Sequence, residues 1–374
     1  MKRMIAMIIS FCVVAYNEEK YLPSLFADIC RQTYPREKIE VVLVDSGSED
    51  GTRRLMEAFR DRERGFFGIQ VLDNPGRIQA AGWNVAIRNF RGDVLARIDA
   101  HTKIPEDFLA RNAALLAEGE MVTGGMRPCL IRDPNPWREL LLEAENSLFG
   151  GGIAPYRRDV GRRYVKSMFH ACYRREVLER VGLMDESLGR TEDNEFHYRI
   201  RKAGYRLCFD PEICSYQYAR PTLRKMIKQK YENGYWIGVT AWKCPGCLSS
   251  YHFVPFLFVC GIAGTGILSL GKRSWPAKLM WAAYGGLCGF MTGASLIRTR
   301  KPLTILLPFL FLALHVSYGL GTVNGLAAGA EMKTRRREGA GIDAEAGNTD
   351  SRKAYSGGIA NTSVPECQKG EVTS

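Results

Sequence analysis

The sequence lacks a cysteine framework and a glycine-rich phosphate loop. Its 11 cysteines are scattered over 374 residues, and because a disulfide scaffold of this size would be unusual, we expect a reducing compartment. A sugar-phosphate nucleotidyltransferase normally has a glycine-rich loop bearing lysine or arginine near its first strand. Residues 15–19 (AYNEE) offer acids instead, which argues against that class.

A signal-peptide cleavage site is also missing near the N-terminus. Residues 1–14 carry two basic residues and then an apolar run, as a secretion signal does. However, no small-residue cleavage site follows, and the run ends in a polar turn at residues 16–19. We therefore expect a buried first strand here rather than a signal peptide.

Acidic side chains are in the minority. There are 40 aspartates and glutamates against 52 lysines and arginines, and the formal net charge is +12. Such a charge favours acidic partners, namely nucleotides, anionic lipid headgroups or nucleic acid. The length and the 46% hydrophobic content allow one large core and an appendage.

Short β-rich runs alternate with amphipathic stretches in the first third of the chain. Strands are expected at residues 5–14, 39–44, 68–72, 94–98 and 121–124. Helices fit at residues 21–31, 52–59, 77–88 and 105–118. Such alternation predicts the α/β class, with a largely parallel, right-handed, doubly wound sheet.

The pattern becomes less regular after residue 124. A turn is expected at residues 133–136 (DPNP) and a flexible loop at residues 150–152 (GGG). Further on, helices are expected at residues 174–181 and 194–203, and a strand at residues 206–209.

The composition changes beyond Arg220. Residues 220–243 mix basic and aromatic side chains, which suits a membrane interface; the alternative is a solvated basic helix that covers the core. Three uncharged apolar stretches follow, at residues 253–270, 279–297 and 303–330. Because spanning a bilayer takes about 20 apolar residues, we predict two to three transmembrane helices.

The basic residues that follow the last apolar stretch help to predict how many times the chain crosses the membrane. Three spans from a cytoplasmic catalytic region would place Lys333 and residues 335–337 (RRR) outside, against the positive-inside tendency, whereas an even number places them inside. One stretch is then re-entrant or interfacial, and the first, which contains Pro255, is the weakest. The chain thus divides into a catalytic domain (1–219), an interfacial region (220–249), transmembrane helices (250–332) and a disordered tail (333–374).

Asp99 and His101 are the first candidates for chemistry. Asp99 ends the apolar run at residues 94–98, and His101 follows two residues later. A carboxylate with a second ligand at this spacing can hold a divalent cation against a diphosphate. Imidazole suits manganese better than magnesium, so Mn²⁺ is favoured over Mg²⁺. The alternative is that Asp99 caps a turn and His101 is a surface residue.

Four segments in order carry a family resemblance. They are residues 13–19 (VVAYNEE), 44–52 (VDSGSEDGT), 99–101 (DAH) and 192–193 (ED). Together they resemble glycosyltransferase family 2 over roughly residues 8–235. Three local strings, NPGRIQ from residue 74, RIDAH from residue 97 and SLFGGG from residue 147, resemble membrane-associated bacterial transferases of the succinoglycan or exopolysaccharide type.

The resemblance implies a GT-A fold and a nucleotide-sugar donor, most often a UDP-sugar, with inversion at the anomeric carbon. It implies that Ala15, Tyr16 and Glu18 line the nucleoside. Asp45 would accept hydrogen bonds from the base or ribose, and Ser46 stands where many members have a second acid. The alternative for residues 45–52 is a polar strand-to-helix turn in which Asp50 caps a helix.

Two arginines are candidates for the diphosphate or the sugar. Arg77 and Arg97 could each form paired hydrogen bonds to phosphate oxygens, or could be a surface or salt-bridging arginine. Of the isolated histidines, His170 and His197 are expected in packing or surface roles rather than in contact with substrate.

Glu192 and Asp193 are the candidates for the catalytic base. Inversion needs one group to take the proton from the acceptor hydroxyl, and we assign this to Asp193, with Glu192 orienting the acceptor or the loop. The alternative is that Thr191 caps a helix whose first turn favours acids. No covalent intermediate is needed, which fits the absence of a serine or cysteine nucleophile constellation. The pair Cys244 and Cys247 lacks the second ligand pair of a structural zinc site.

Membrane placement fits a lipid-linked saccharide acceptor, in cell-surface or exopolysaccharide synthesis at the inner (cell) membrane, with a cytoplasmic catalytic domain. Polysaccharide-assembly proteins are the implied partners. Transfer to a polyprenyl phosphate and a non-catalytic nucleotide-binding scaffold are the alternatives. Nucleic acid is not expected, because the basic residues after Arg220 directly precede apolar spans.

Overall fold

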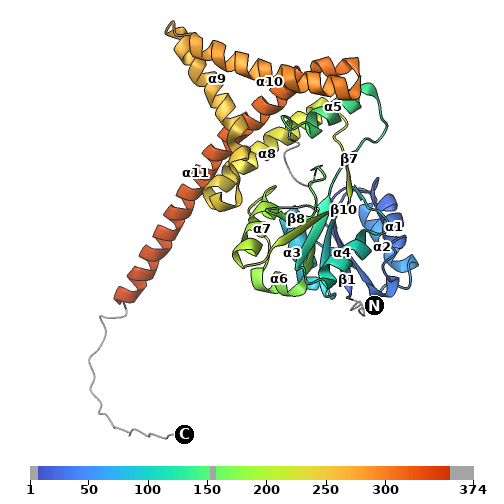
Figure 1. Ribbon diagram of the computed structural model, residues 1–374. Coiled ribbons are helices and arrows are strands. Elements are labelled where there is room, and N and C mark those ends of the chain that lie inside the picture. Colours follow the sequence, from blue (N-terminus) through green and yellow to red (C-terminus); the bar gives the residue numbers. More distant parts are fainter. Residues whose placement is uncertain (1–6, 152–156, 354–374) are drawn as a thin grey trace, which may run out of the picture. The chain divides into compact units, whose positions relative to one another are not determined.

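The computed structural model describes residues 7–151 and 157–353, with side chains up to residue 334. Figure 1 shows the fold as a ribbon, with the sheet flanked by helices. Within these residues the main sheet has eight strands in the order β3-β2-β1-β4-β9-β6-β10-β8. The strands are β1 (Ile9–Ala15), β2 (Ile39–Asp45), β3 (Gly68–Asp73), β4 (Val94–Asp99), β6 (Val122–Met126), β8 (Arg163–Val165), β9 (Cys172–Arg174) and β10 (Leu207–Cys214).

The first four of these strands in the chain are parallel, as expected. β1 pairs with β2 and with β4, and β2 pairs with β3, all in parallel. β9 then pairs antiparallel with both β4 and β6, and β8 pairs antiparallel with β10. The sheet is therefore mixed beyond β4, and the expected strand positions agree with the observed ones to within a few residues.

Helices cover both faces of the sheet. One hydrophobic cluster contains side chains of α1 (Leu22–Cys30), α2 (Thr52–Arg62) and α4 (Phe108–Ala117). The other contains side chains of α3 (Gln79–Asn89), α6 (Arg175–Val181) and α7 (Glu192–Lys202). Successive residues of β1 face opposite clusters: Phe11 and Val13 lie in the first and Cys12 in the second, as the alternation of side chains along a strand requires.

A smaller sheet joins β5 (Thr102–Lys103), β11 (Tyr216–Tyr218) and β7 (Cys129–Leu130). It follows directly on β4 and β10, so residues 101–103 and 215–218 come together next to the ends of those strands. Helix α5 (Pro136–Asn146) begins at the expected turn, where the Asn135 side chain accepts a hydrogen bond from the Arg138 backbone N–H.

The C-terminal part is helical. It contains α8 (Leu223–Lys243), α9 (Val254–Leu270), α10 (Trp275–Thr299) and α11 (Leu307–Lys353), with the short 3₁₀ turns η3 (Pro245–Cys247), η4 (Ser250–Phe253) and η5 (Pro302–Leu306) between them; another, η1 (Arg36–Lys38), precedes β2. Helices α5, α8, α10 and α11 share a third hydrophobic cluster. Contacts group the chain up to Gly329 into one unit, so α8 to α10 and the first part of α11 pack as part of that unit.

Two segments of the described chain are long and apolar enough to cross a membrane, Ser250–Leu270 and Pro302–Thr334. No residue in the most apolar part of the first is buried, whereas 39% of the corresponding part of the second is buried. The first stretch, which we expected to be re-entrant or interfacial, is one of these two, whereas the middle stretch, α10, is not. Residues 279–297 of α10 carry no charge, but four glycines, Trp281 and Tyr284 make this stretch less hydrophobic.

Large apolar side chains are exposed on all three of these helices. Leu257 and Ile267 of α9, Phe290 and Ile297 of α10, and Phe309 of α11 are each more than 60% exposed. An apolar surface of this extent marks an interaction site for a membrane or another protein.

The prediction of a disordered tail from residue 333 onward does not hold for its first part. Helix α11 runs without a break to Lys353, so residues 333–353 are helical where we expected disorder. Adding residues to an existing helix avoids the cost of nucleation, and residues 331–337 (EMKTRRR) are mostly good helix formers. Residues 354–374 lie outside the described part of the chain.

Candidate active site

Three parallel strands bring the expected donor-side residues to one edge of the sheet. In the register of β1 and β2, Ala15 pairs with Asp45, and in that of β1 and β4, Val14 pairs with Asp99. Asp45 and Asp99 therefore flank the end of β1 on its two sides. The carboxyl edge of such a sheet is where open α/β folds bind ligands.

Hydrogen bonds join the loop after β1 to the loop after β2. The Asn17 N–H donates to Ser48 Oγ over 2.9 Å, the Glu49 N–H to Asn17 Oδ1 over 2.8 Å, and the Glu18 N–H to Thr52 Oγ1 over 2.7 Å. These bonds hold the two loops, residues 16–18 and 46–52, together as one rim of the site beside Ala15. Tyr16 is 52% exposed on this rim, so its ring is available to a ligand.

Asp45 and Ser46 are both buried in this rim. The carboxylate of Asp45 accepts a hydrogen bond from the Ser48 N–H over 3.3 Å. Ser46 Oγ accepts one from Asn74 Nδ2 over 2.9 Å. The alternative role of Asp50 is also present, since it accepts a hydrogen bond from the Thr52 N–H at the start of α2.

Arg77 lies against the same loop. A Cβ added at Gly47 would lie 3.0 Å from Arg77 Nε, and both residues have positive φ, +77° for Gly47 and +55° for Arg77. The exposed guanidinium is thus placed next to Asp45 and Ser46, where it can reach a bound anion.

Asp99 is held by a buried histidine. Its Oδ2 lies 3.2 Å from His170 Nε2, while His170 Nδ1 is 2.7 Å from Ser215 Oγ. Although burial acts in the opposite direction, His170 and Arg97 hold the pKa of Asp99 well below its usual range. Asp99 is therefore an anion at neutral pH. His170 was expected in a packing or surface role, and it is indeed buried and packed, with Asp99 as one of its neighbours.

His101 forms an ion pair with Glu18. Its Nδ1 lies 2.9 Å from Glu18 Oε1, and its Nε2 lies 3.3 Å from Gln217 Nε2. Burial acts to lower its pKa, but Glu18 and Asp99 prevail and raise it above 6.5. Glu18 and His101, which the resemblance assigned to the nucleoside and the metal respectively, are thus neighbours.

Arg97 links the sheet to α7. Its Nη2 lies 3.2 Å from Glu192 Oε1 in a buried ion pair, and its guanidinium lies 4.9 Å from the centre of a Trp83 ring. Burial opposes its charge, but Glu192, Asp99 and Asp193 hold the pKa of Arg97 above its usual value. The salt-bridging alternative for Arg97 is therefore realised in this structure.

Glu192 and Asp193 begin α7 and are both buried. Burial raises the pKa of Glu192 to about 7, with the charge of Asp193 adding to the rise and that of Arg97 opposing it. Burial also raises the pKa of Asp193, against the charge of Arg97. Two neighbouring acids titrate as a pair, and burial makes both of these carboxyls bind a proton more tightly than usual.

Thr191 does not cap α7 through its side chain. Its Oγ1 lies 2.5 Å from Thr240 Oγ1 of α8 instead. Thr191 is nevertheless the N-cap residue of α7, and acids occupy the first turn, so the capping alternative holds in position but without a side-chain bond to the helix. The bond to Thr240 attaches the start of α7 to α8. Glu192 Oε2 accepts no hydrogen bond from the described residues, which leaves a buried oxygen at the site.

The donor set at Asp99 suits a divalent cation held largely by its substrate. No group of three or more histidine, cysteine or acidic side chains within the described residues could hold a metal ion. Magnesium is commonly bound by one or two carboxylates together with substrate phosphates. Asp99, an anion beside His101, fits that mode. His101 could bind a metal through its unprotonated Nε2 while its Nδ1–H donates to Glu18, as metal-binding histidines commonly do.

Sequence reasoning missed Asn74, Trp83 and Ser215 as parts of the site. Asn74 stands in one of the local strings that carry the resemblance, so a signal was present. His170 has φ of +47°, a rare conformation for a residue with a side chain, and no local pattern predicts it. His197 has the expected packing role, with Ser167 and Tyr173 bound to its two ring nitrogens.

The fold and the site together define an α/β protein of the GT-A class, with carboxylates along the carboxyl edge of the sheet and a second carboxylate pair facing them from a helix. Residues 10–182 match the family model described as "Glycosyl transferase family 2". This chain therefore carries a glycosyltransferase family 2 domain, as the motifs predicted.

Several characterised proteins are similar in sequence. Over 223 residues the chain is 30% identical to the succinoglycan biosynthesis protein ExoA of Rhizobium meliloti (strain 1021), covering 58% of this chain and 65% of that protein, slightly under two thirds of its length. It is 26% identical over 326 residues to the dolichyl N-acetyl-alpha-D-glucosaminyl phosphate 3-beta-D-2,3-diacetamido-2,3-dideoxy-beta-D-glucuronosyltransferase of Methanococcus voltae, covering 86% of this chain and 98% of that protein.

A solved structure shares the fold. The mannosyltransferase PcManGT from Pyrobaculum calidifontis, in complex with GDP-Man and Mn²⁺, superposes with a TM-score of 0.53 at 21% identity, covering 85% of this chain and 87% of that one. The match extends well beyond the family 2 domain.

Proposed function

We propose that this protein is an inverting glycosyltransferase that moves a sugar from a nucleotide sugar, a UDP-sugar, to a lipid-linked saccharide. One observation carries the proposal: the buried ion pair of Arg97 and Glu192, 3.2 Å apart, joins the acidic start of α7 to the strand that ends in Asp99. A base and a donor site are thereby fixed relative to each other, as a direct displacement requires.

In the proposed reaction Asp193 accepts the proton of the acceptor hydroxyl. The hydroxyl oxygen forms the new bond to the anomeric carbon as the bond from that carbon to the diphosphate breaks, and the nucleoside diphosphate leaves with the electron pair. The anomeric centre is inverted because one displacement occurs. Burial raises the pKa of Asp193 above its usual value, which makes this carboxylate a stronger base than an exposed aspartate.

The remaining site residues bind the donor. Tyr16 and Asp45 would contact the nucleoside beside Ala15 and Ser46, and Arg77 would contact the diphosphate. Asp99 and His101 would hold a divalent metal, Mn²⁺ in preference to Mg²⁺, which neutralises charge on the leaving diphosphate when bound. The mannosyltransferase of similar fold contains Mn²⁺ with its nucleotide sugar.

The helical part of the chain supports the proposed acceptor and location. Exposed apolar side chains on α9 to α11 support attachment to the inner face of the cell membrane, with the catalytic domain in the cytoplasm, where sugar nucleotides are made. The name of the Methanococcus voltae relative specifies a dolichyl-linked sugar phosphate. This supports a lipid-linked saccharide over a bare polyprenyl phosphate.

The test is transfer by membranes that contain the wild-type protein, Asp193→Asn or the control Asp61→Asn. Asp61 is an exposed aspartate on α2 that pairs with Arg60. We would supply a panel of nucleotide sugars, manganese and two acceptors, polyprenyl-linked saccharide and polyprenyl phosphate, and follow nucleoside diphosphate release and product mass.

We expect a sugar-sized mass gain on the lipid-linked saccharide, reduced about 10²–10⁴-fold in Asp193→Asn, which is the usual contribution of a general base. Asp61→Asn should match wild type. Transfer only to polyprenyl phosphate would overturn the acceptor assignment. Nucleotide binding without transfer from any donor would support the scaffold alternative instead.

A further inference from the structure

Two ion pairs join α8 to the loop of residues 185–191, which directly precedes Glu192 and Asp193, here called the acidic pair. In each, α8 supplies one partner and the loop the other: Glu232 pairs with Arg190, and Lys243 Nζ lies 2.5 Å from Asp185 Oδ2. All four side chains are partly exposed. Because ion pairs at the surface contribute little to stability one at a time, these two locate the loop against α8 but do not hold it firmly.

A buried hydrogen bond lies between the two ion pairs in the sequence of α8. The hydroxyl oxygens of Thr240 and Thr191 are 2.5 Å apart, and these residues are only 0% and 3% exposed. Thr191 is the N-cap residue of α7 and the direct neighbour of Glu192. Loss of this bond would leave a buried hydroxyl without its partner, which is costly. The bond therefore fixes the start of α7 on α8.

The loop also passes close to a large side chain of α8. A Cβ added at Gly189 would lie 2.3 Å from Trp236 Cζ2, so the loop backbone lies directly against the indole ring. The contacting positions of α8 are three or four residues apart and so lie on one face of the helix: Glu232, Trp236, Thr240 and Lys243. We call this the loop face of α8.

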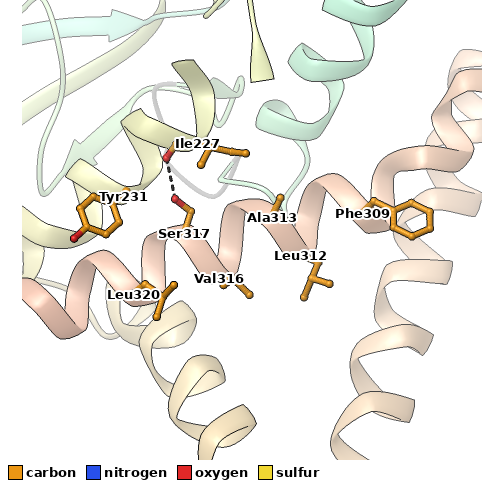
Figure 2. A pocket seen from close by; sticks show the side chains of 8 residues that line it. All are labelled: Ile227, Tyr231, Phe309, Leu312, Ala313, Val316, Ser317 and Leu320. Atoms are coloured by element: carbon orange, nitrogen blue, oxygen red, sulfur yellow. Dashed lines mark hydrogen bonds between the residues drawn. The ribbon is translucent and has the colours of Figure 1, made fainter. Parts of the chain in front are cut away.

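The opposite side of α8 packs on α11. Figure 2 shows one contact, in which the Ser317 hydroxyl of α11 donates a hydrogen bond to the Ile227 carbonyl over 2.9 Å. Further along, a Cβ added at Gly238 would lie 2.5 Å from the Thr322 carbonyl oxygen. Gly238 is two positions from Thr240, which is about 200° around a helix. Helix α8 is therefore held between α11 on one side and the loop before the acidic pair on the other.

We propose that Thr240 is a positioning residue for the catalytic base, and that the loop face of α8 sets the place of the acidic pair through Thr191. The inference rests on the proposed function, in which Asp193 takes the proton of the acceptor hydroxyl. The proposed donor contacts come instead from the ends of β1, β2 and β4. Since a misplacement of about 1 Å can lower a rate about 10²-fold, loss of the Thr240 hydroxyl should slow the chemical step and leave donor binding intact.

The first test is amide hydrogen exchange of the full-length protein in lipid nanodiscs, followed by mass spectrometry. Thr240→Val removes the hydroxyl but keeps the branched shape, whereas Thr240→Ser keeps the hydroxyl. For peptides that cover residues 191–199 we expect roughly 3- to 10-fold faster exchange in Thr240→Val, as for the loss of one hydrogen bond, and near wild-type exchange in Thr240→Ser. Unchanged exchange of these peptides in Thr240→Val would overturn the proposal.

A second variant decides the matter if Thr240→Val does not fold. Glu232→Gln combined with Lys243→Met removes both ion pairs of the loop face, and because these pairs are partly exposed the variant should fold. Faster exchange over residues 185–199 in this variant would support the proposal, and unchanged exchange would overturn it.

Kinetics separate a positioning role from a purely structural one. In Thr240→Val we expect kcat to fall about 10- to 100-fold, with an unchanged KM for the nucleotide sugar and recovery in Thr240→Ser. The matched control is Thr322→Val, since Thr322 is a buried threonine of α11 whose hydroxyl donates to the Tyr318 carbonyl of its own helix over 3.0 Å. It should have the kcat of wild type. Equal losses in Thr240→Val and Thr240→Ser would overturn the positioning role.

The two proposals fail in different ways. No transfer by the wild-type protein from any donor would refute the proposed function, while hydrogen exchange alone would still decide whether α8 holds the acidic pair. Full activity in a folded Thr240→Val protein would refute the positioning role and leave the glycosyltransferase in place.

Discussion

The guanidinium of Arg97 lies 3.2 Å from the carboxylate of Glu192, and both side chains are buried. These residues are 95 positions apart in the chain, yet this contact joins β4 to the start of α7. Asp99 is two residues beyond Arg97 and Asp193 is one beyond Glu192. A single ion pair therefore helps to set the separation of the proposed donor and base groups.

Removal of one partner of this ion pair should lower the stability of the folded protein. Arg97→Ala leaves Glu192 buried beside Asp193 without its cation, and we expect a loss of about 3–5 kcal/mol in the free energy of unfolding, measured by denaturant titration. Arg62→Ala, an exposed arginine that pairs with Glu63, is the control and should change stability far less. Arg97→Met combined with Glu192→Leu should lose less than Arg97→Ala alone; a larger loss in the double variant would contradict this account.

Activity and stability should depend on pH in opposite directions. The pKa of Glu192 rises from 4.5 to about 7 in the folded protein, and that of Asp193 also rises. The folded state thus holds its protons more tightly than the unfolded state, so this contribution to stability is complete below about pH 4.5 and is lost as the pH rises toward 7. The base must be deprotonated, so kcat/KM should increase over the same range.

This can be checked with thermal unfolding and initial rates measured from pH 5 to 8, a range that brackets the shifted pKa. Glu192→Gln removes one of the two acids and should flatten the dependence of stability on pH. A stability that rises between pH 5 and 7 by the same amount in wild type and in Glu192→Gln would show that these two groups do not control it.

Metal removal and restoration should distinguish the roles of the two proposed metal ligands, Asp99 and His101. Chelation by EDTA should abolish transfer, and added Mn²⁺ should restore it better than Mg²⁺, because imidazole favours the softer ion. His101→Ala should reduce the preference for Mn²⁺, whereas Asp99→Asn should prevent restoration by either ion. Mass spectrometry of released nucleoside diphosphate gives the rates. Full activity of Asp99→Asn in EDTA would exclude the assignment.

The packing of α8 on α11 should tolerate no side chain at Gly325. A leucine there would collide with the Tyr235 carbonyl, since even a Cβ would lie 1.9 Å from it, and we expect a loss of about 1–3 kcal/mol or more. Gly285→Leu on α10 is the matched control, because a Cβ at that position meets nothing within 4 Å. Thermal unfolding of both variants in the same detergent is the measurement, and equal losses would contradict the proposed close contact.

Local sequence patterns correctly predicted those elements that depend on a single segment of the chain. The strands that end at Ala15, Asp45 and Asp99 were predicted because apolar runs followed by polar turns are a short-range signal. The parallel order followed from the alternation with helices, and the carboxyl ends of parallel strands meet at one edge. The same reasoning did not predict the role of His170, because its contacts with Asp99, Thr102 and Ser215 join segments that are far apart in the chain.

The sequence by itself determined the class of fold, the edge of the sheet at which the carboxylates gather and the presence of long apolar helices, because periodicity and composition are local properties. Only the tertiary structure decided that Arg97 pairs with Glu192, that Glu18 pairs with His101 and that α8 and α11 pack closely through facing glycines. Those relationships join residues that are far apart in the chain, and their distances depend on how whole elements pack.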